Sequence, residues 1–562
     1  MDSSPVFAHV IAVEGAKITA VINMTAAADR PSEASQDVST HVPRGKILPG
    51  AQQKNAELNL QEIQIGAMVK IPTSRSVTFG LITSLAVSSG AEGARVTDQR
   101  LAKIELLGEA LHSERIGVQF QFQRGVSVYP ALWSPISLAA NEDLAQIYAR
   151  PSEACVRIGT IHQDASIPAY LLVDKLLGMH FAVLGTTGSG KSTTVALLLR
   201  QILTAYPQGR VLLLDPHNEY HQAFSDMSET MNTENLVLPY WMFNSEEIIA
   251  LCVEKESPTF DRECSYLRDA VLYAKTRYNG ETMPPEAVTI DSPIPYQMSD
   301  VLWYLNDKKG ELEQPDGVGP YMRLIQKISR LKNDRRYKFI FPGLVIDDVF
   351  SKFCARLMRL PVMGKPITVF DLSGVPGEIV DIVVSVLCRI LFDFAVWSKG
   401  VASAPLLLVC EEAHRYIAED PTVGFAPTRK LIGKIAQEGR KYGLSLGLVT
   451  QRPSLLSQTI LSQANTLIAL RMANETDQSF VRKAVPETAF GLMNALPALK
   501  RQEAIISGEG VTLPMWVRFN NLTEAQRPRS ETQSFTERWA KDDWTDEAVD
   551  QIIWQWRLGV RH

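Results

Sequence analysis

The stretch that decides the fold is Gly185-Thr186-Thr187-Gly188-Ser189-Gly190-Lys191-Ser192, which fits the pattern G-x-x-x-x-G-K-[ST] at every fixed position. The apolar run His180–Leu184 precedes it and a helical pattern follows it, which is the context of a phosphate-binding loop. Glycines let backbone N–H groups wrap a phosphate chain, and the helix N-terminus adds a favourable dipole. We expect Lys191, as a catalytic residue, on the β- and γ-phosphates and Ser192 on Mg²⁺. The predicted nucleotide-binding residues are Gly185, Thr186, Thr187, Gly188, Ser189, Gly190, Lys191, Ser192 and Thr193.

Two acidic residues follow a second buried strand. The apolar run Pro405–Cys410 ends in Glu411-Glu412-Ala413-His414. Because the carboxyl ends of parallel strands meet at one edge of a sheet, we expect this pair to lie beside the phosphate loop. In nucleotide hydrolases, acidic residues help to hold Mg²⁺ and a polar residue positions the attacking water. We therefore assign the metal to Ser192 and Glu411, and the activation of water to Glu412.

Two more predicted strands end in polar residues. Asp215 follows Val211–Leu214, and Gln451 follows Leu444–Thr450. Ligands bind at the carboxyl edge of a parallel sheet, so we expect the Gln451 amide to sense the γ-phosphate as a further catalytic residue. A structural role, as the cap of a strand end, is the alternative for both positions.

The segment Thr428–Tyr442 has the pattern of one helix with an apolar stripe and a basic face. A ring-forming ATPase needs a guanidinium at the neighbouring subunit's γ-phosphate, and Arg440 is our first candidate for it. Arg452 is the second. The basic face is a candidate DNA contact, with a merely solvated face as the alternative. Its lysines are Lys430, Lys434 and Lys441.

The pattern of apolar and turn-forming residues changes along the chain. Short β-branched runs punctuated by glycine fill the first part, which is typical of a β-sandwich or a small β-barrel. Apolar strands then alternate with helices, which predicts an α/β core with a mostly parallel sheet. The predicted boundaries are 1–165 for the barrel, 166–241 and 343–510 for the two parts of the core, 242–342 for a helical insertion, and 511–562 for a C-terminal brace or tail. Val549, Ile552, Ile553 and Trp556 share one helix face in that tail.

Composition and charge exclude several classes of protein. The chain has 562 residues, and 57 Lys plus Arg stand against 62 Asp plus Glu, a formal net charge of −5. Any nucleic-acid contact must therefore come from a local basic surface. The six cysteines form no C-x-x-C pair, which fits a reducing cytoplasm. The first residues lack a secretory pattern, and charges interrupt the longest apolar stretch, Ile379–Trp397, so we expect a cytoplasmic protein without a membrane span.

The motifs together resemble those of the HerA family, which are DNA translocases of the FtsK-HerA branch of RecA-like P-loop ATPases. The resemblance covers roughly Leu172 to Gly510 and extends well beyond the phosphate loop. The first acid is more usually Asp, and Glu411 keeps the charge there. The further matching blocks are Asp215–His217, Leu238–Trp241, Asp291–Tyr296, Asp371–Pro376, Glu411–His414, Gly439–Gly443 and Gln451–Ser454.

The resemblance implies a RecA-like core behind a small N-terminal barrel, with ATP and Mg²⁺ as cofactors. It implies a homohexameric ring with ATP at the subunit interfaces and double-stranded DNA in the central channel. It also implies a partner at the barrel face, either a NurA-like nuclease of DNA repair or a sirtuin-like or nuclease effector of antiviral defence. The predicted function is an ATP-driven DNA translocase or helicase. The alternative is a nucleotide-binding ring scaffold that assembles and regulates an effector with little translocation.

Overall fold

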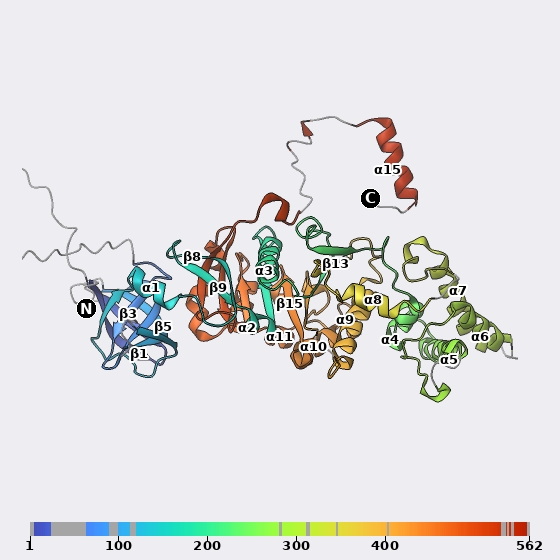
Figure 1. Ribbon diagram of the computed structural model, residues 1–562, viewed down its shortest axis with the longest axis horizontal. Helices are drawn as coiled ribbons and strands as arrows, with labels where there is room; N and C mark the ends of the chain where they lie inside the picture. The colour runs from blue at the N-terminus through green and yellow to red at the C-terminus, as the bar shows by residue number, and fades with distance from the viewer. Residues whose placement is uncertain are drawn as a thin grey trace, which may run out of the picture.

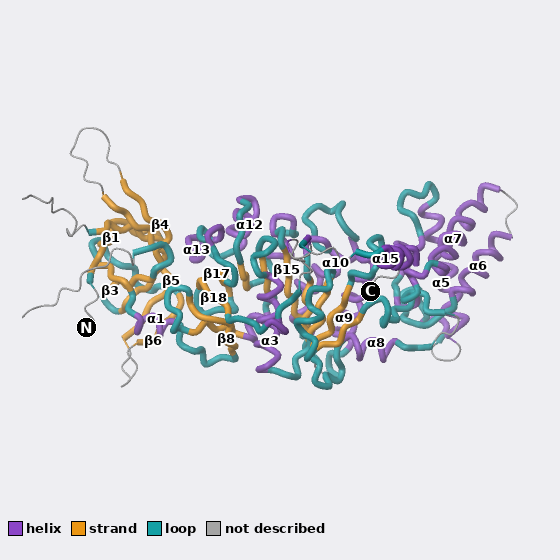
Figure 2. Tube along the Cα trace, turned by 90° about the horizontal axis from the view of Figure 1, so that it is seen from above, coloured by secondary structure: helices purple, strands orange, loops and turns teal. Residues whose placement is uncertain are grey.

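The computed structural model describes residues 5–23, 63–88, 99–112, 120–279, 284–310, 315–343, 347–401, 404–529, 536, 539–540 and 544–558. Two β-sheets and a group of helices follow one another along its longest axis (Figure 1). The N-terminal barrel lies at one end, a large sheet occupies the middle, and helices α5, α6 and α7 gather at the other end. The view from above shows the same order (Figure 2).

The N-terminal domain is a six-stranded barrel. Its strands follow the order β2-β1-β7-β3-β4-β5, and pairing of β2 with β5 closes the ring, while β6 pairs with the other half of β5. Alternate side chains such as Phe7, Ile18, Val69 and Ile104 fill the interior, because successive residues of a strand face opposite sides. The strands are β1 (Val6–Glu14), β2 (Lys17–Ile22), β3 (Met68–Pro72), β4 (Ser76–Ser88), β5 (Gln99–His112), β6 (Phe120–Arg124) and β7 (Pro135–Leu138).

The second sheet has eleven strands in the order β12-β13-β11-β14-β15-β10-β16-β17-β18-β8-β9. The strands from β12 to β16 pair in parallel, and those from β16 to β9 pair antiparallel. The strands are β8 (Cys155–Ile161), β9 (Pro168–Leu172), β10 (Phe181–Leu184), β11 (Val211–Asp215), β12 (Ser228–Met231), β13 (Ile367–Asp371), β14 (Leu406–Cys410), β15 (Leu444–Thr450), β16 (Thr466–Ala469), β17 (Glu503–Gly508) and β18 (Met515–Phe519). The predicted fold class, a mostly parallel α/β core behind a small barrel, is confirmed.

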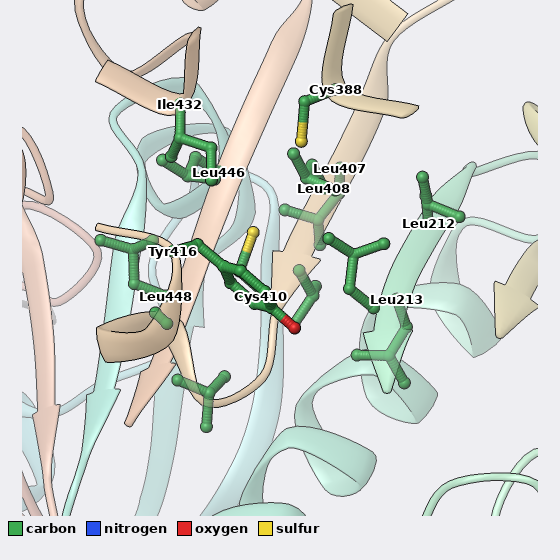
Figure 3. Close-up of a cluster of buried hydrophobic side chains, with 14 of the residues drawn as sticks. Leu212, Leu213, Cys388, Leu407, Leu408, Cys410, Tyr416, Ile432, Leu446 and Leu448 are labelled. Atoms are coloured by element: carbon green, nitrogen blue, oxygen red, sulfur yellow. The ribbon is translucent and has the colours of Figure 1, made fainter. Parts of the chain in front are cut away.

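The parallel strands are buried on both faces, so their residues are apolar without alternation. Figure 3 shows part of this core, where leucines of β11, β14 and β15 meet Cys388 of α9 and Ile432 of α10. Helix α9 is buried along most of its length, as the apolar pattern of Ile379–Trp397 predicts. Its Arg389 reaches the buried Glu247 of α4 at 2.9 Å, which ties the helical segment to the core.

The helices are α1 (Asn141–Ile147), α2 (Val173–Gly178), α3 (Lys191–Ala205), α4 (Ser245–Cys252), α5 (Phe260–Asn279), α6 (Met298–Gly310), α7 (Pro315–Asn333), α8 (Phe350–Leu357), α9 (Val380–Trp397), α10 (Ala426–Glu438), α11 (Gln458–Leu461), α12 (Glu475–Ala484), α13 (Phe490–Met493) and α15 (Asp546–Leu558). Helix α15 stands apart from both sheets in Figure 1, and Val549, Ile552 and Trp556 on it are exposed. Within the described ranges, no helix is both long and apolar enough to cross a membrane.

Two expected boundaries differ from the structure. Strand β8 falls inside the predicted barrel region, yet it pairs with β18 and β9 in the second sheet. Strand β18 falls inside the predicted tail, yet it lies between β17 and β8. The pairing of β8 with β18 could not be read from local patterns, because these two strands are far apart in the sequence. The antiparallel half of the sheet therefore draws strands from both sides of the predicted core.

The barrel meets the second sheet's domain at Gly491 of α13. A Cβ atom placed on Gly491 would lie 2.0 Å from Thr83 Cγ2 of β4, so only glycine fits this contact. The Gly491 N–H donates to Glu105 Oε2 of β5 at 3.3 Å. Burial raises the pKa of Glu105, with this hydrogen bond acting in the opposite direction. The two domains are thus joined by a close backbone contact.

Candidate active site

The phosphate loop joins β10 to α3 at the carboxyl edge of the parallel strands. Gly188 and Gly190 have φ values of 75° and 102°, in the left-handed region that favours glycine. Thr186 fixes the loop against the end of β16, since its N–H and its Oγ1 donate to the carbonyl oxygen of Arg471 at 3.1 and 3.0 Å. On the other side, the Gly185 N–H donates to the Thr450 carbonyl of β15 at 3.3 Å. The loop is therefore held by both neighbouring strands.

Lys191 is buried at the start of α3 and donates to the Thr186 carbonyl at 3.3 Å. Burial lowers the pKa of Lys191, and the charges of Glu411, Glu412 and Glu219 oppose this shift. Nearby, Ser189 Oγ is buried without a hydrogen-bond partner among the described residues. The Ser189 hydroxyl without a partner and the buried Lys191 ammonium belong to the same loop and helix start. Together with the backbone N–H groups of the loop, they suit a chain of phosphate groups.

Glu411 is fully enclosed at the end of β14. Its Oε2 accepts a hydrogen bond from the Tyr220 hydroxyl at 2.8 Å, and Tyr220 is buried as well. Burial raises the pKa of Glu411 to about 8, and the nearby Glu412 adds to the shift while Tyr220 and Lys191 oppose it. A cation bound beside this carboxyl group would oppose the effect of burial and favour its ionised form.

Glu412 differs from its neighbour in backbone and charge. Its φ of 50° lies in the left-handed region, which costs energy for a residue with a side chain and is common at functional sites. Its Oε2 lies 3.2 Å from His414 Nδ1 but lacks a hydrogen bond of good geometry among the described residues. Burial alone would raise the pKa of Glu412, but His414, Lys191 and His217 together hold it below its usual value. Glu412 is therefore an ionised carboxylate whose Oε2 lies beside His414 without a well-aligned hydrogen bond from the described residues.

Ser192 on α3 carries the hydroxyl expected to bind Mg²⁺. Its Oγ donates to Glu219 Oε2 at 2.6 Å, and Glu219 comes from the loop after β11. The described residues contain no group of three His, Cys, Asp or Glu side chains placed to hold a metal by themselves. Mg²⁺ in nucleotide sites is held by one or two protein groups together with substrate phosphates, so the donors Ser192 and Glu411 fit that cation. With the cation bound, charge between the β- and γ-phosphates is neutralised.

Asp215 and Gln451 lie at the ends of β11 and β15, on either side of β14, and they contact different groups. Asp215 is buried and accepts the backbone N–H groups of His217 and Tyr220 at 3.2 and 2.9 Å. Gln451 Oε1 accepts a hydrogen bond from Thr187 Oγ1 of the phosphate loop. Asp215 therefore caps its strand, and the Gln451 amide reaches the loop.

Of the three lysines expected on one basic face, Lys430 and Lys434 lie one turn apart on α10, whereas Lys441 lies beyond the end of the helix. The helix ends at Glu438 and a 3-10 turn, η6 (Gly439–Tyr442), follows, so Lys441 leaves the face of Lys430. Gly439 lies so close to Leu444 that a Cβ atom would be 2.7 Å from the Leu444 carbonyl oxygen. Lys434 places its Nζ 4.6 Å from the centre of the Phe392 ring, a contact with the core. The predicted single helix Thr428–Tyr442 is therefore wrong in its last turn.

Both candidate arginine fingers are exposed. Arg440 lies in η6 and Arg452 directly follows Gln451. The Arg452 N–H donates to Thr450 Oγ1 at 3.0 Å, which orders the backbone there. Their guanidinium groups can thus be reached from outside the subunit.

Three contacts of the site were not predicted from the sequence: Ser192 with Glu219, Glu411 with Tyr220, and Thr187 with Gln451. The sequence does contain a feature from which the first two contacts could have been predicted. Glu219 and Tyr220 close the segment Asp215–Tyr220, which follows a strand at the same sheet edge. A loop at that edge can reach the phosphate site even when its first acid caps the strand.

Comparison with known proteins bears on this site. Residues 156–391 match the family described as "Helicase HerA, central domain". The chain is 27% identical to the "DNA double-strand break repair helicase HerA" of Pyrococcus furiosus, over 78% of this chain and 81% of the relative. It is 25% identical to the protein of the same name from Sulfurisphaera tokodaii, over 91% and 99%. A solved structure of VirB4 from Thermoanaerobacter pseudethanolicus aligns with a TM-score of 0.47 and 16% identity, over 67% of this chain and 99% of that one.

Proposed function

Because residues 156–391 match the central domain of the HerA helicases, an ATP-hydrolysing class, we propose that this chain is the subunit of a homohexameric ring that moves along double-stranded DNA. ATP and Mg²⁺ bind at the phosphate loop, and the ring works in the cytoplasm with a second protein. The relatives in Pyrococcus furiosus and Sulfurisphaera tokodaii are helicases of DNA double-strand break repair, which supports this proposal.

The single observation that carries the proposal is that the phosphate loop after β10, with Lys191, and Glu412 after β14 lie at the carboxyl edge of one parallel sheet. Both side chains are buried, and the charge of Lys191 contributes to the lowered pKa of Glu412. Lys191 holds the charge of the terminal phosphates, and Glu412 accepts a hydrogen bond from the attacking water and polarises it. Hydrolysis at this edge is the chemistry that drives a motor.

The test is the rate of ATP hydrolysis with and without duplex DNA, combined with particle imaging of the ring. We expect DNA to raise the rate and Lys191→Ala to abolish it. Glu234→Gln serves as the matched control, because Glu234 is exposed and remote from the phosphate loop in sequence. A ring that hydrolyses ATP at the same slow rate with or without DNA would instead be a scaffold that assembles an effector.

Within the ring, we assign Arg440 to the neighbouring subunit's γ-phosphate, with Arg452 as the second candidate. Its exposure on η6 supports this assignment. Arg440→Ala protein should bind nucleotide normally and hydrolyse it about 10³–10⁵-fold more slowly. Mixed with Lys191→Ala subunits, it offers an intact phosphate loop to a neighbour's arginine, so some activity should return. No recovery in rings shown to be mixed would contradict delivery from the neighbour.

The barrel is the proposed docking site of the partner, a NurA-like nuclease or a sirtuin-like or nuclease effector. It contains none of the residues of the nucleotide site, and a ring presents six copies of a weak site, so avidity can hold the partner. The test is co-purification with two truncations. One begins at Pro151, which keeps β8 in its sheet, and the other ends at Arg529, which keeps β18. Retention of the partner without the barrel, and loss without residues 530–562, would contradict barrel docking.

A further inference from the structure

Ser192 and Glu411, the two predicted metal ligands, each have a partner on the same short loop. This metal loop is defined here as Asp215–Tyr220, which follows β11. Ser192 Oγ donates to Glu219 Oε2 at 2.6 Å, and the Tyr220 hydroxyl donates to Glu411 Oε2 at 2.8 Å. Consecutive residues of one loop thus contact both sides of the expected cation site.

The metal loop is fixed by its own hydrogen bonds, so the position of Glu219 is well determined. The Asp215 carboxylate accepts the N–H groups of His217 and Tyr220, and Asn218 adopts a left-handed φ of 54° that turns the chain. The Glu219 carbonyl accepts the N–H of Arg529 at 3.1 Å. Glu219 itself is only half-buried, and its carboxylate lies at the end of the loop that faces α3.

The chemistry of a serine ligand requires such a partner. A hydroxyl that binds a cation uses an oxygen lone pair, so its hydrogen must be donated to another acceptor. In this chain Glu411 Oε2 already accepts from Tyr220, whereas Glu219 Oε2 lies at charge-assisted hydrogen-bond distance from Ser192 Oγ. Hydrogen-bond partners of metal ligands orient those ligands, and the loss of such a partner commonly costs about 10–100-fold in metal affinity.

We propose that Glu219 is a positioning residue for the divalent cation of the nucleotide site: it accepts the Ser192 hydrogen and so turns the Ser192 lone pair toward the cation. The inference rests on the proposed ATP site. It adds Glu219 to that site as a third acidic residue, which comes from the loop after β11, whereas Glu411 and Glu412 follow β14. Glu219 acts through Ser192, while Glu411 remains the acid that faces the cation.

The test measures how Mg²⁺ tightens the binding of a non-hydrolysable ATP analogue, by calorimetric titration of the full-length chain. The variants are Glu219→Gln, Ser192→Ala, the two combined, and Glu234→Gln as an exposed control with the same chemical change. We expect Glu219→Gln to raise the Mg²⁺ concentration for half-maximal tightening about 10–100-fold. Binding of the analogue without Mg²⁺ should not change, and neither should the control.

The double variant decides between positioning and a merely structural role of the loop. If Glu219 acts through Ser192, then Glu219→Gln adds nothing to the Mg²⁺ requirement of Ser192→Ala. The inference is overturned if Glu219→Gln leaves the Mg²⁺ requirement unchanged, if it acts equally in the Ser192→Ala protein, or if it weakens binding without Mg²⁺. A parent chain that binds no analogue at all would overturn the ATP site itself, which is a different and distinguishable failure.

Discussion

The loops after β11 and β14 begin alike and are used differently. Both follow buried parallel strands that pair with one another, and both begin with an acid, Asp215 in one and Glu411 in the other. Asp215 gives its oxygens to N–H groups of its own loop. In the β14 loop, the second acid, Glu412, keeps an oxygen without a well-aligned hydrogen bond among the described residues.

The difference shows that acids at neighbouring strand ends can be satisfied by their own loop to very different degrees. A carboxylate that accepts two N–H groups is already satisfied and serves the loop. Glu412 adopts a left-handed backbone at a local cost in energy, and none of the described N–H groups donates to its Oε2. On these hydrogen bonds we expect Asp215 to serve the structure of its loop and Glu412 to serve hydrolysis, although both acids occupy the same edge of the sheet.

The largest test of this comparison is a substitution of Glu412. Glu412→Gln should lower ATP turnover about 10²–10⁴-fold while ATP binding remains, because an amide keeps the shape but cannot accept a proton. Turnover and nucleotide affinity are measured side by side, with Glu411→Gln as the neighbouring control. Near-parental turnover of Glu412→Gln, together with a large loss in Glu411→Gln, would reverse the roles of the two acids.

Gln451, at the end of β15, extends the comparison to a third strand. Its amide oxygen accepts a hydrogen bond from Thr187 of the phosphate loop, so we expect it to act in hydrolysis rather than only to cap its strand. Gln451→Ala should lower turnover about 10²-fold, since one positioned polar group near the γ-phosphate is lost. Single-turnover kinetics with saturating ATP check this. A loss confined to nucleotide affinity would place Gln451 with the structural residues.

Asp215 should affect stability more than chemistry. Burial raises the pKa of Asp215 from 3.8 to about 6, so the folded protein holds this proton more tightly than the unfolded chain. This contribution to stability is full below about pH 4 and is lost as the pH rises to about 6. Asp215→Asn removes that pH dependence and one N–H acceptor, which lowers stability by about 1–3 kcal/mol.

The Tm of the parent and of Asp215→Asn, measured by scanning calorimetry between about pH 4 and pH 7, checks this prediction. The Tm of the parent should exceed the Tm of Asp215→Asn by less as the pH rises. A constant difference would mean that the Asp215 carboxyl does not titrate as its burial indicates. Turnover of the folded variant should fall far less than in Glu412→Gln, and an equal fall would remove the distinction between the two loops.

The smallest expected effect is at His414, which supports the ionised form of Glu412. The pKa of Glu412 is held low in part by this imidazole, so removing it should move that pKa upward. A base must be ionised to act, so His414→Ala should shift the acid limb of the turnover profile to higher pH. The pH profile of both proteins measures this. An unshifted limb would mean that the charge of Glu412 depends on Lys191 and His217 instead.

The nucleotide edge could be predicted from the sequence because its signals are local. The residues Gly185–Ser192 fix a loop, and apolar runs mark the strands whose ends carry Glu412 and Gln451. Glu219 was missed because its role depends on a tertiary contact between a loop and α3, which no spacing rule reports. The antiparallel strands β8 and β18 were assigned to other domains for the same reason, since their pairing joins distant segments.

The pairing of β8 with β18 has a consequence for synthesis of the chain. Strand β8 ends at Ile161 and its partner begins at Met515, so about 350 residues separate them. At roughly 5–20 residues per second, the ribosome needs about 20–70 s to supply that partner after β8 has emerged. During this time the hairpin of β8 and β9 lacks its neighbour, and an unpaired edge of this kind invites pairing with other chains. The antiparallel half of the sheet is therefore completed late. Until then, chaperones and proteases that act on nascent chains can reach the unpaired edge of β8.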